Sequence, residues 1–262
     1  MKKILLLTIG IALNNLNAFC QEGGGAATIS LDTTSSVKEK AVTISIESAF
    51  ANSYLWRGIQ LNRGLVVQPS VNLEWKNFTF NIWNNTSMFE NNDNERFQEV
   101  DITISKTFEP GNFYLEPTLL VYTYPSADGF SFTSEASIYA AYYFSNLGIF
   151  INPSTDFIQN TGGTFSETGL NYDRETDASE LIWNIAYGIG NEKFISYNIL
   201  SDVNHTEAPY QLIDLNISYQ KNFGKTFYIK PYAQFTQVLN TNFQNALTPR
   251  QLNFSFSIGA KF

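Results

Sequence analysis

The last eleven residues of the chain alternate strictly between apolar and non-apolar side chains. The apolar set consists of Leu252, Phe254, Phe256, Ile258, Ala260 and Phe262. A period of two residues is that of a β-strand, whose successive side chains point to opposite faces. A strand of this kind that ends the chain on an aromatic residue is typical of a bacterial outer-membrane β-barrel, where one face meets lipid and the other a polar lumen.

The composition is compatible with a membrane barrel. Hydrophobic residues make up 44% of the chain, but after the first twenty residues no run approaches the ~18 apolar residues that a membrane helix needs. Only every second residue of a barrel strand meets lipid, so the average hydrophobicity stays moderate. Aromatic residues make up 15%, with 22 Phe and 14 Tyr, which suits a lipid-facing surface and its interfacial girdles.

The N-terminus predicts export. Lys2 and Lys3 precede a short apolar run, and Ala18-Phe-Cys20 places small residues before a cleavage site at Gln21. These features indicate a signal peptide over residues 1–20. A lipoprotein signal that leaves Cys20 acylated is the alternative, although Phe19 is bulky for one. Residues 21–41 are rich in Gly, Ser and Thr and are expected to form a flexible periplasmic lead-in.

From residue 42 to residue 262 the pattern predicts an all-β, transmembrane, antiparallel up-and-down barrel of about twelve strands. The predicted strands are 42–57, 64–75, 78–88, 97–108, 112–124, 131–145, 147–158, 179–190, 193–201, 209–222, 225–240 and 248–262.

Short and long connections alternate between these strands, as in barrels with short periplasmic turns and longer outer loops. Both termini are therefore expected in the periplasm. Segment 163–174 is either a further strand or part of an outer loop, so ten and fourteen strands stay open, as does a secreted β-sandwich. Four prolines fall inside predicted strands, where a bulge or local irregularity is expected: Pro69, Pro117, Pro153 and Pro231.

If the apolar side chains face lipid, the polar ones line the lumen. The expected charged lining consists of Glu47, Arg57, Glu74, Glu99, Asp101, Glu116, Glu135, Asp156, Asp214, Lys230 and Lys261. Acidic residues predominate in this set, and rings of Asp and Glu favour cations over anions. About twelve strands leave a narrow interior, because wide aqueous channels need roughly 16–18. These side chains either contact solutes or pair with one another across a filled interior.

Little in the sequence supports catalysis or metal binding. His205, the one histidine, falls in a predicted outer loop beside Asp202 and Glu207, and no phosphate-binding or nucleophile motif occurs. Acidic clusters at 91–95 and 173–177 lack the spacing of an EF-hand and are expected to be solvated loops. The net charge of −8 and the lack of basic runs make nucleic acid an unsuitable partner. No cofactor or metal is expected.

Three segments resemble a known family. They are residues 53–60 (Ser-Tyr-Leu-Trp-Arg-Gly-Ile-Gln), 67–75 (Val-Gln-Pro-Ser-Val-Asn-Leu-Glu-Trp) and 81–84 (Asn-Ile-Trp-Asn). Together they resemble the opening of the TorF family of porins, in which a Tyr-x-x-Arg-Gly element ends the first strand. The resemblance implies an outer-membrane barrel with a transport role, and it supplies no substrate. From its position, Arg57 is expected either to clamp a carboxylate bidentately or to contact a solute.

These observations predict an outer-membrane, porin-like channel for small cations or neutral solutes, without enzymatic activity. A barrel lipid hydrolase and a closed barrel that serves as an anchor or surface-binding module are the alternatives. The expected partners are outer-membrane lipid and lipopolysaccharide, small solutes, and the barrel-assembly machinery, which would recognise the C-terminal Phe262.

Overall fold

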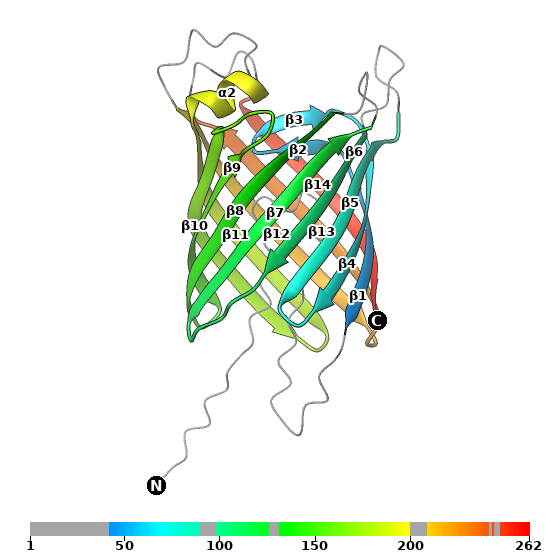
Figure 1. Ribbon diagram of the computed structural model, residues 1–262. Helices are drawn as coiled ribbons and strands as arrows, with labels where there is room; N and C mark the ends of the chain where they lie inside the picture. Colours follow the sequence, from blue (N-terminus) through cyan, green and yellow to red (C-terminus); the bar gives the residue numbers. More distant parts are fainter. Residues whose placement is uncertain (1–41, 90–97, 126–130, 200–208, 241–242, 244–246) are drawn as a thin grey trace.

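The computed structural model describes residues 42–89, 98–125, 131–199, 209–240, 243 and 247–262. Twelve of its strands form one closed antiparallel barrel (Figure 1). They are β1 (Thr43–Ala51), β4 (Val66–Trp75), β5 (Phe78–Ser87), β6 (Gln98–Lys106), β7 (Phe113–Tyr124), β8 (Ser131–Phe144), β9 (Leu147–Asp156), β10 (Thr164–Thr176), β11 (Ser179–Gly190), β12 (Tyr210–Phe223), β13 (Phe227–Val238) and β14 (Arg250–Lys261).

The first and last strands close the barrel. β1 pairs with β14, for example through Phe50 opposite Phe256, and with β4 on its other side, through Phe50 opposite Val67. Every other strand pairs with its neighbours in the sequence, which is the up-and-down order. Closure leaves no strand edge with unpaired backbone groups, the requirement for a sheet in lipid.

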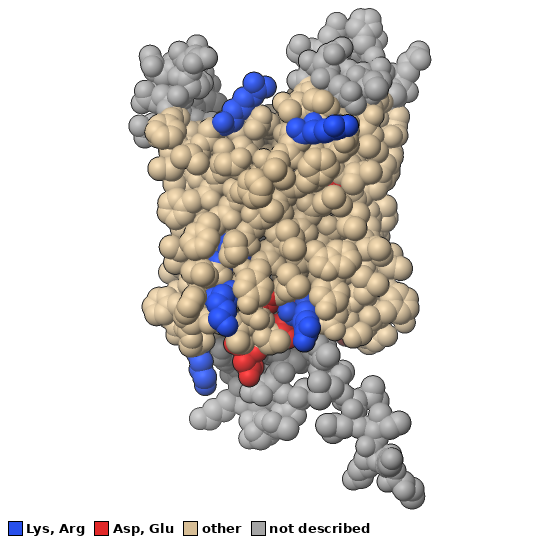
Figure 2. All heavy atoms as spheres, turned by 180° about the vertical axis from the view of Figure 1, so that it is seen from behind, with Lys and Arg blue, Asp and Glu red and all other residues tan. Residues whose placement is uncertain are grey.

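The alternation in the last strand separates lipid-facing from inward-facing side chains as predicted. Phe254 and Phe256 are 52% and 42% exposed, whereas Asn253 and Ser257 are buried inside the barrel. The same division holds around the wall, where Ile and Phe side chains form the outer surface. Figure 2 shows one face of this surface, on which charged side chains gather near the two ends and the band between them is mostly uncharged.

The two ends of the barrel differ. At the tight-turn end, strands are joined by residues 76–77, 107–112, 145–146, 177–178 and 224–226, with positive φ at Lys76, Gly111, Ser145 and Gly224. At the loop end, the connections are longer, and one of them carries a short hairpin made of β2 (Tyr54–Trp56) and β3 (Ile59–Asn62). β1 begins and β14 ends at the tight-turn end (Figure 1).

The predicted strand number is confirmed, but the strands that make it up differ in two segments. Segment 163–174, left open between a further strand and an outer loop, belongs to β10, whereas 193–201, predicted as a strand, holds helix α2 (Glu192–Asn198). The outward face of β10 mixes Ser166 and Thr168 with Leu170 and Tyr172, so its alternation is weak. The short connection predicted between strands 179–190 and 193–201 is therefore part of a long connection at the loop end, and a tight turn lies at 177–178 instead.

Helix α2 has a local signal that explains it. The side chain of Asn191 accepts a hydrogen bond from the backbone N–H of Phe194, and Glu192 lies in the first turn. An Asn cap and an acidic first turn both satisfy the free N–H groups that begin a helix. No helix in the described part of the chain has the length and apolar content needed to cross a membrane.

The four prolines do not produce bulges. The register is the same before and after each of them, and each leaves a gap in the ladder towards one neighbouring strand, as Pro231 does between β12 and β13. Towards the other neighbour the pairing continues, for example Pro231 opposite Phe256. Of the two outcomes expected, a bulge or a local irregularity, the structure shows the second, a local loss of pairing, because proline has no N–H to donate.

Candidate functional site

The β2–β3 hairpin turns at Arg57 and Gly58, which have φ angles of 47° and 76°. Positive φ at both central residues is the mark of a two-residue type I′ turn. A Cβ atom on Gly58 would lie only 2.4 Å from the hydroxyl oxygen of Tyr210, so this glycine also permits a close approach to β12. Tyr54 and Leu55 of β2 are almost completely buried, although β2 is not one of the strands that form the barrel wall. The hairpin is therefore folded into the mouth of the barrel.

The hairpin reaches strands on all sides of this mouth. Its described contacts with the wall are Tyr54 with Trp83 on β5, Trp56 with Tyr122 on β7, Arg57 with Glu135 on β8, the Arg57 carbonyl with Tyr210 on β12, and the Gly58 carbonyl with Gln251 on β14. Because β5, β8, β12 and β14 are spread around the barrel, a segment that touches all of them spans its bore. The first predicted strand thus does not continue to residue 57 along the wall but turns inward after β1.

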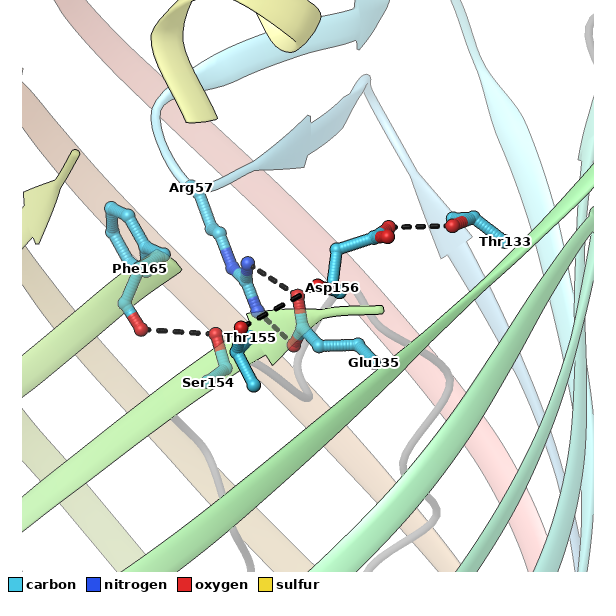
Figure 3. A network of polar contacts seen from close by, with 7 residues as sticks. All are labelled: Arg57, Thr133, Glu135, Ser154, Thr155, Asp156 and Phe165. Carbon is cyan, nitrogen blue, oxygen red and sulfur yellow. Dashed lines mark hydrogen bonds and ion pairs between the residues drawn. The ribbon is translucent and has the colours of Figure 1, made fainter. Parts of the chain in front are cut away.

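Arg57 makes the bidentate carboxylate contact that its position predicted (Figure 3). Its Nη1 donates to Oε2 of Glu135 at 2.8 Å, and Nη2 donates to Oε1. Both side chains are buried. The guanidinium also lies over the rings of Trp56 and Phe165, at 4.7 and 4.9 Å from their centroids. Charge-assisted paired hydrogen bonds and cation–π contacts both strengthen where water is excluded.

Glu135 lies directly opposite a second carboxylate, that of Asp156 on β9. Asp156 accepts hydrogen bonds from Thr133 Oγ1 and from the backbone N–H groups of Ile158 and Asn160, the last two at 2.9 Å. Two unbalanced like charges opposite each other would destabilise the sheet. The loop amides and Thr133 stabilise the charge of Asp156, and Arg57 neutralises that of Glu135.

On the other side of the hairpin the contacts are apolar. Ile59 packs in a buried cluster with Phe165, Phe194, Ile195, Tyr210, Leu212, Val238 and Phe243. Phe194 and Ile195 belong to α2, and the ring of Phe194 lies 5.7 Å from that of Trp56. The hairpin is thus joined by apolar packing to α2 and to β10, β12 and β13, and by a charge pair to β8. The sequence did not predict this apolar cluster, although Tyr210 and Leu212 fall at inward-facing positions.

The expected lining residues are distributed over the whole inner wall. Glu99, Asp101, Glu116, Glu135, Asp156 and Asp214 are buried at inward-facing positions, and Glu47, Glu74, Lys230 and Lys261 are partly exposed at inward-facing positions nearer the tight-turn end. Arg57 extends from the hairpin, not from a wall strand. Three further inward-facing acids were missed: Glu167 and Asp173 on β10 and Glu180 on β11. The first two were missed because the strand that carries them was left out of the twelve predicted strands.

Several of these acids have identified donors. Glu47 accepts from Lys230 at 2.7 Å and from Tyr228 at 2.8 Å, near the tight-turn end. Asp214 accepts from Asn216, Gln234 and Thr236, all neutral groups. Neutral donors stabilise a carboxylate without cancelling its charge. In the described part of the chain, the inner wall therefore carries more acidic than basic side chains.

Aromatic side chains also occupy the interior. Tyr114, Tyr139, Tyr143 and Phe150 form a buried cluster on β7, β8 and β9, with the rings of Tyr139 and Phe150 stacked at 5.3 Å. They face inward between the polar residues of the same strands. Together with the hairpin they make the interior of this barrel narrow.

Two of the predicted loop features lie outside the described residues, namely His205 and the acidic cluster at 91–95. The acidic cluster at 173–177 was placed wrongly, because Asp173 lies within β10 and Asp177 in a tight turn at the opposite end from the long loops. Among the residues that the structure describes, no three acidic, histidine or cysteine side chains come together in a way that would hold a metal ion.

No protein-family model and no curated protein sequence matches the chain. Among solved structures, the KdgM porin is similar with a TM-score of 0.52 and 10% identity, over 84% of this chain and 99% of that chain. An outer membrane channel from Pseudomonas putida F1 (TM-score 0.47, 7% identity, 89% and 100%) and the CymD monoaromatic hydrocarbon channel (0.45, 9%, 85% and 88%) are more distant. The likeness to KdgM shows the fold, a closed twelve-strand barrel that resembles those of bacterial outer-membrane proteins.

Proposed function

We propose that this chain is an outer-membrane, porin-like channel for small cationic or neutral solutes, and a member of the TorF family. The observation that carries the proposal is a closed barrel with an apolar outer band and a polar, predominantly acidic inner wall. An apolar band is stable only against lipid, and a closed sheet is one of the two structures that satisfy all backbone groups there. The three segments that resemble the TorF family correspond to the hairpin, β4 and β5.

The orientation follows from the connections. Short turns lie on the periplasmic side of bacterial barrels, so the tight-turn end faces the periplasm and the loop end faces outward. Residues 1–20 are then the export signal and 21–41 the periplasmic lead-in, both outside the described residues. Phe262 ends the chain immediately after β14, where the barrel-assembly machinery would recognise it. Lipid and lipopolysaccharide would surround the apolar band.

The expected solutes follow from the wall charges. Inward-facing acids such as Glu99, Asp101 and Asp214 outnumber the cations Arg57, Lys230 and Lys261. Rings of acidic side chains attract cations and repel anions, and salt screens charges less in a narrow interior than at an open surface. A cation or a neutral solute should therefore pass more readily than an anion of the same size.

Osmotic swelling of proteoliposomes tests the proposal with three solutes of matched size. Glucosamine carries a positive charge, glucose none and gluconate a negative charge. We expect swelling to be fastest in glucosamine, slower in glucose and slowest in gluconate. Liposomes that contain heat-unfolded protein should swell no faster than liposomes without protein. Fastest entry of gluconate would contradict the role of the acidic wall. No entry of any solute, through the natural protein or through variants that lack the Arg57–Glu135 pair, would contradict a channel.

One observation favours the second candidate, a closed barrel that acts as an anchor. The hairpin and the tyrosine cluster both occupy the interior, and a barrel filled in this way conducts nothing as long as it stays filled. In that case function would lie in the outer connections. The swelling assay separates the two candidates, because the anchor predicts identical traces with and without protein.

A further inference from the structure

We propose that the β2–β3 hairpin is the closing element of this channel and that the Arg57–Glu135 pair is the latch that holds it shut. The inference rests on the proposed channel function and adds which part of the chain blocks the passage and which bond releases it. It is carried by the contacts of the hairpin and does not depend on the identity of the solute.

The first step is that the hairpin obstructs the bore. Its residues touch β5, β7, β8, β12 and β14, which lie around the circumference. Tyr54, Leu55 and Ile59 are buried, so little space for water surrounds them. A solute that enters at the loop end must therefore pass the hairpin, and in this conformation it meets packed side chains.

The second step is that the hairpin is attached differently on its two sides. Towards β10, β12, β13 and α2 it contributes Ile59 and Trp56 to apolar packing, which water would disrupt at a cost, and the Arg57 carbonyl accepts one hydrogen bond from Tyr210. Towards β8 and β9 it meets a polar stretch of wall that includes Thr133, Glu135, Ser154 and Asp156 (Figure 3). Water can replace protein partners of polar groups with a small net loss. The passage should therefore open between the hairpin and β8–β9, with the apolar side as the hinge.

The third step is that the Arg57–Glu135 pair spans the side that opens. The guanidinium of Arg57, at the tip of the hairpin, and the carboxylate of Glu135, on the wall, form a paired contact between buried groups. Removing one member leaves the other charged and buried without its partner, which strongly disfavours the closed arrangement. The remaining charge is best solvated if the hairpin moves and water enters the gap.

The charge left behind should also set the ion preference of the opened passage. Without Arg57, Glu135 adds a negative charge beside Asp156, so the ratio of K⁺ to Cl⁻ permeability should rise. Without the Glu135 carboxylate, the positive charge of Arg57 is no longer balanced by this acid of the wall, so the ratio should fall. A hairpin that merely stabilises the barrel would not make the two substitutions change selectivity in opposite directions.

Single-channel recordings in planar bilayers test the latch with four variants of the full chain. Arg57→Met and Glu135→Gln each break the pair, and Arg57→Glu combined with Glu135→Arg restores it in reverse. Lys230→Met is the matched control, because it removes the same charge from an ion pair with Glu47 far from the hairpin. A heat-modifiable band on a denaturing gel shows that each barrel has folded.

We expect a several-fold higher mean current for Arg57→Met and for Glu135→Gln than for the natural protein, and a return towards its low current in the reversed pair. Lys230→Met should increase cation preference without a several-fold rise in current. Equal currents from the natural protein and both single variants, all folded, would overturn the latch and leave the channel intact. The absence of current from every folded variant, swelling included, would overturn the channel function and the latch with it.

Discussion

Individual residues explain how the β2–β3 hairpin turns into the interior of the barrel. Arg57 and Gly58 both have positive φ, which L-residues with a Cβ adopt at a cost. Glycine avoids that cost at the second position, and it also leaves room for the Tyr210 hydroxyl, which donates to the Arg57 carbonyl at 2.9 Å. The turn is therefore determined by its own backbone and by one residue of a strand distant in sequence.

A pair of glycine substitutions separates these two effects. Gly111→Ala places a Cβ at φ 70° in open space, so it should cost about 1–2 kcal/mol in the free energy of unfolding. Gly58→Ala introduces the same strain together with a clash against Tyr210, so the loss should be larger. Urea unfolding of the barrel in lipid vesicles measures both. Equal losses would show that the contact with Tyr210 does not constrain the turn.

Two neighbouring acids on β6 test the influence of the inner wall. Glu99 and Asp101 are almost completely buried at inward-facing positions of the same strand. Glu99→Gln combined with Asp101→Asn should move the K⁺ to Cl⁻ permeability ratio towards unity, since it removes two negative charges from the lumen. Glu109→Gln, in a tight turn at the barrel end, is the control. A ratio that moves as far in the control would assign the selectivity to the mouth of the barrel.

At the scale of the strand, the facing of β14 makes the strongest stability prediction. Phe256 faces outward and Ser255 inward in the same strand. Phe256→Arg should cost about 2–4 kcal/mol if the side chain lies near the bilayer midplane, whereas Ser255→Arg should cost much less. The folded fraction, read from the heat-modifiable band after refolding in urea, measures the difference. Similar losses for both would place Phe256 away from lipid.

The strands themselves show what the sequence could predict. β6 and β14 alternate cleanly between lipid-facing and inward-facing residues, and they were predicted correctly. β10 turns Ser166, Thr168 and Arg174 outward beside Leu170 and Tyr172, so no continuous apolar face marked it as a strand. The apolar residues of α2, such as Phe194 and Ile195, led to the prediction of a strand at 193–201. The helix cap at Asn191 was the signal that could have indicated a helix.

The hairpin could be predicted only in part. The Arg-Gly pair indicated a sharp turn and a carboxylate contact for Arg57. Its partner could not be named, because Glu135 lies 78 residues further along and reaches Arg57 only after the barrel has closed. The apolar cluster around Ile59 has the same origin, since its members come from the hairpin, α2, three wall strands and the connection that holds Phe243. Contacts of this kind are set by topology and not by local pattern.

At the scale of the whole molecule, export is the first expectation. The mature protein should begin at Gln21 and carry no lipid, because Phe19 is a poor neighbour for an acylated Cys20. Mass spectrometry of the N-terminal peptide from purified outer membranes gives the result directly. A diacylated Cys20 would make the chain a lipoprotein and would fix residues 21–41 to the periplasmic leaflet.

The central claim is that this barrel is a channel whose inner wall favours cations. The most direct measurement is the reversal potential of the purified protein in a planar bilayer across a KCl gradient. The acidic wall predicts discrete currents with K⁺ more permeant than Cl⁻, a preference that weakens as the ionic strength rises. A preference for Cl⁻ would mean that Arg57, Lys230 and Lys261 control the passage, and a folded barrel that never conducts would contradict the channel itself.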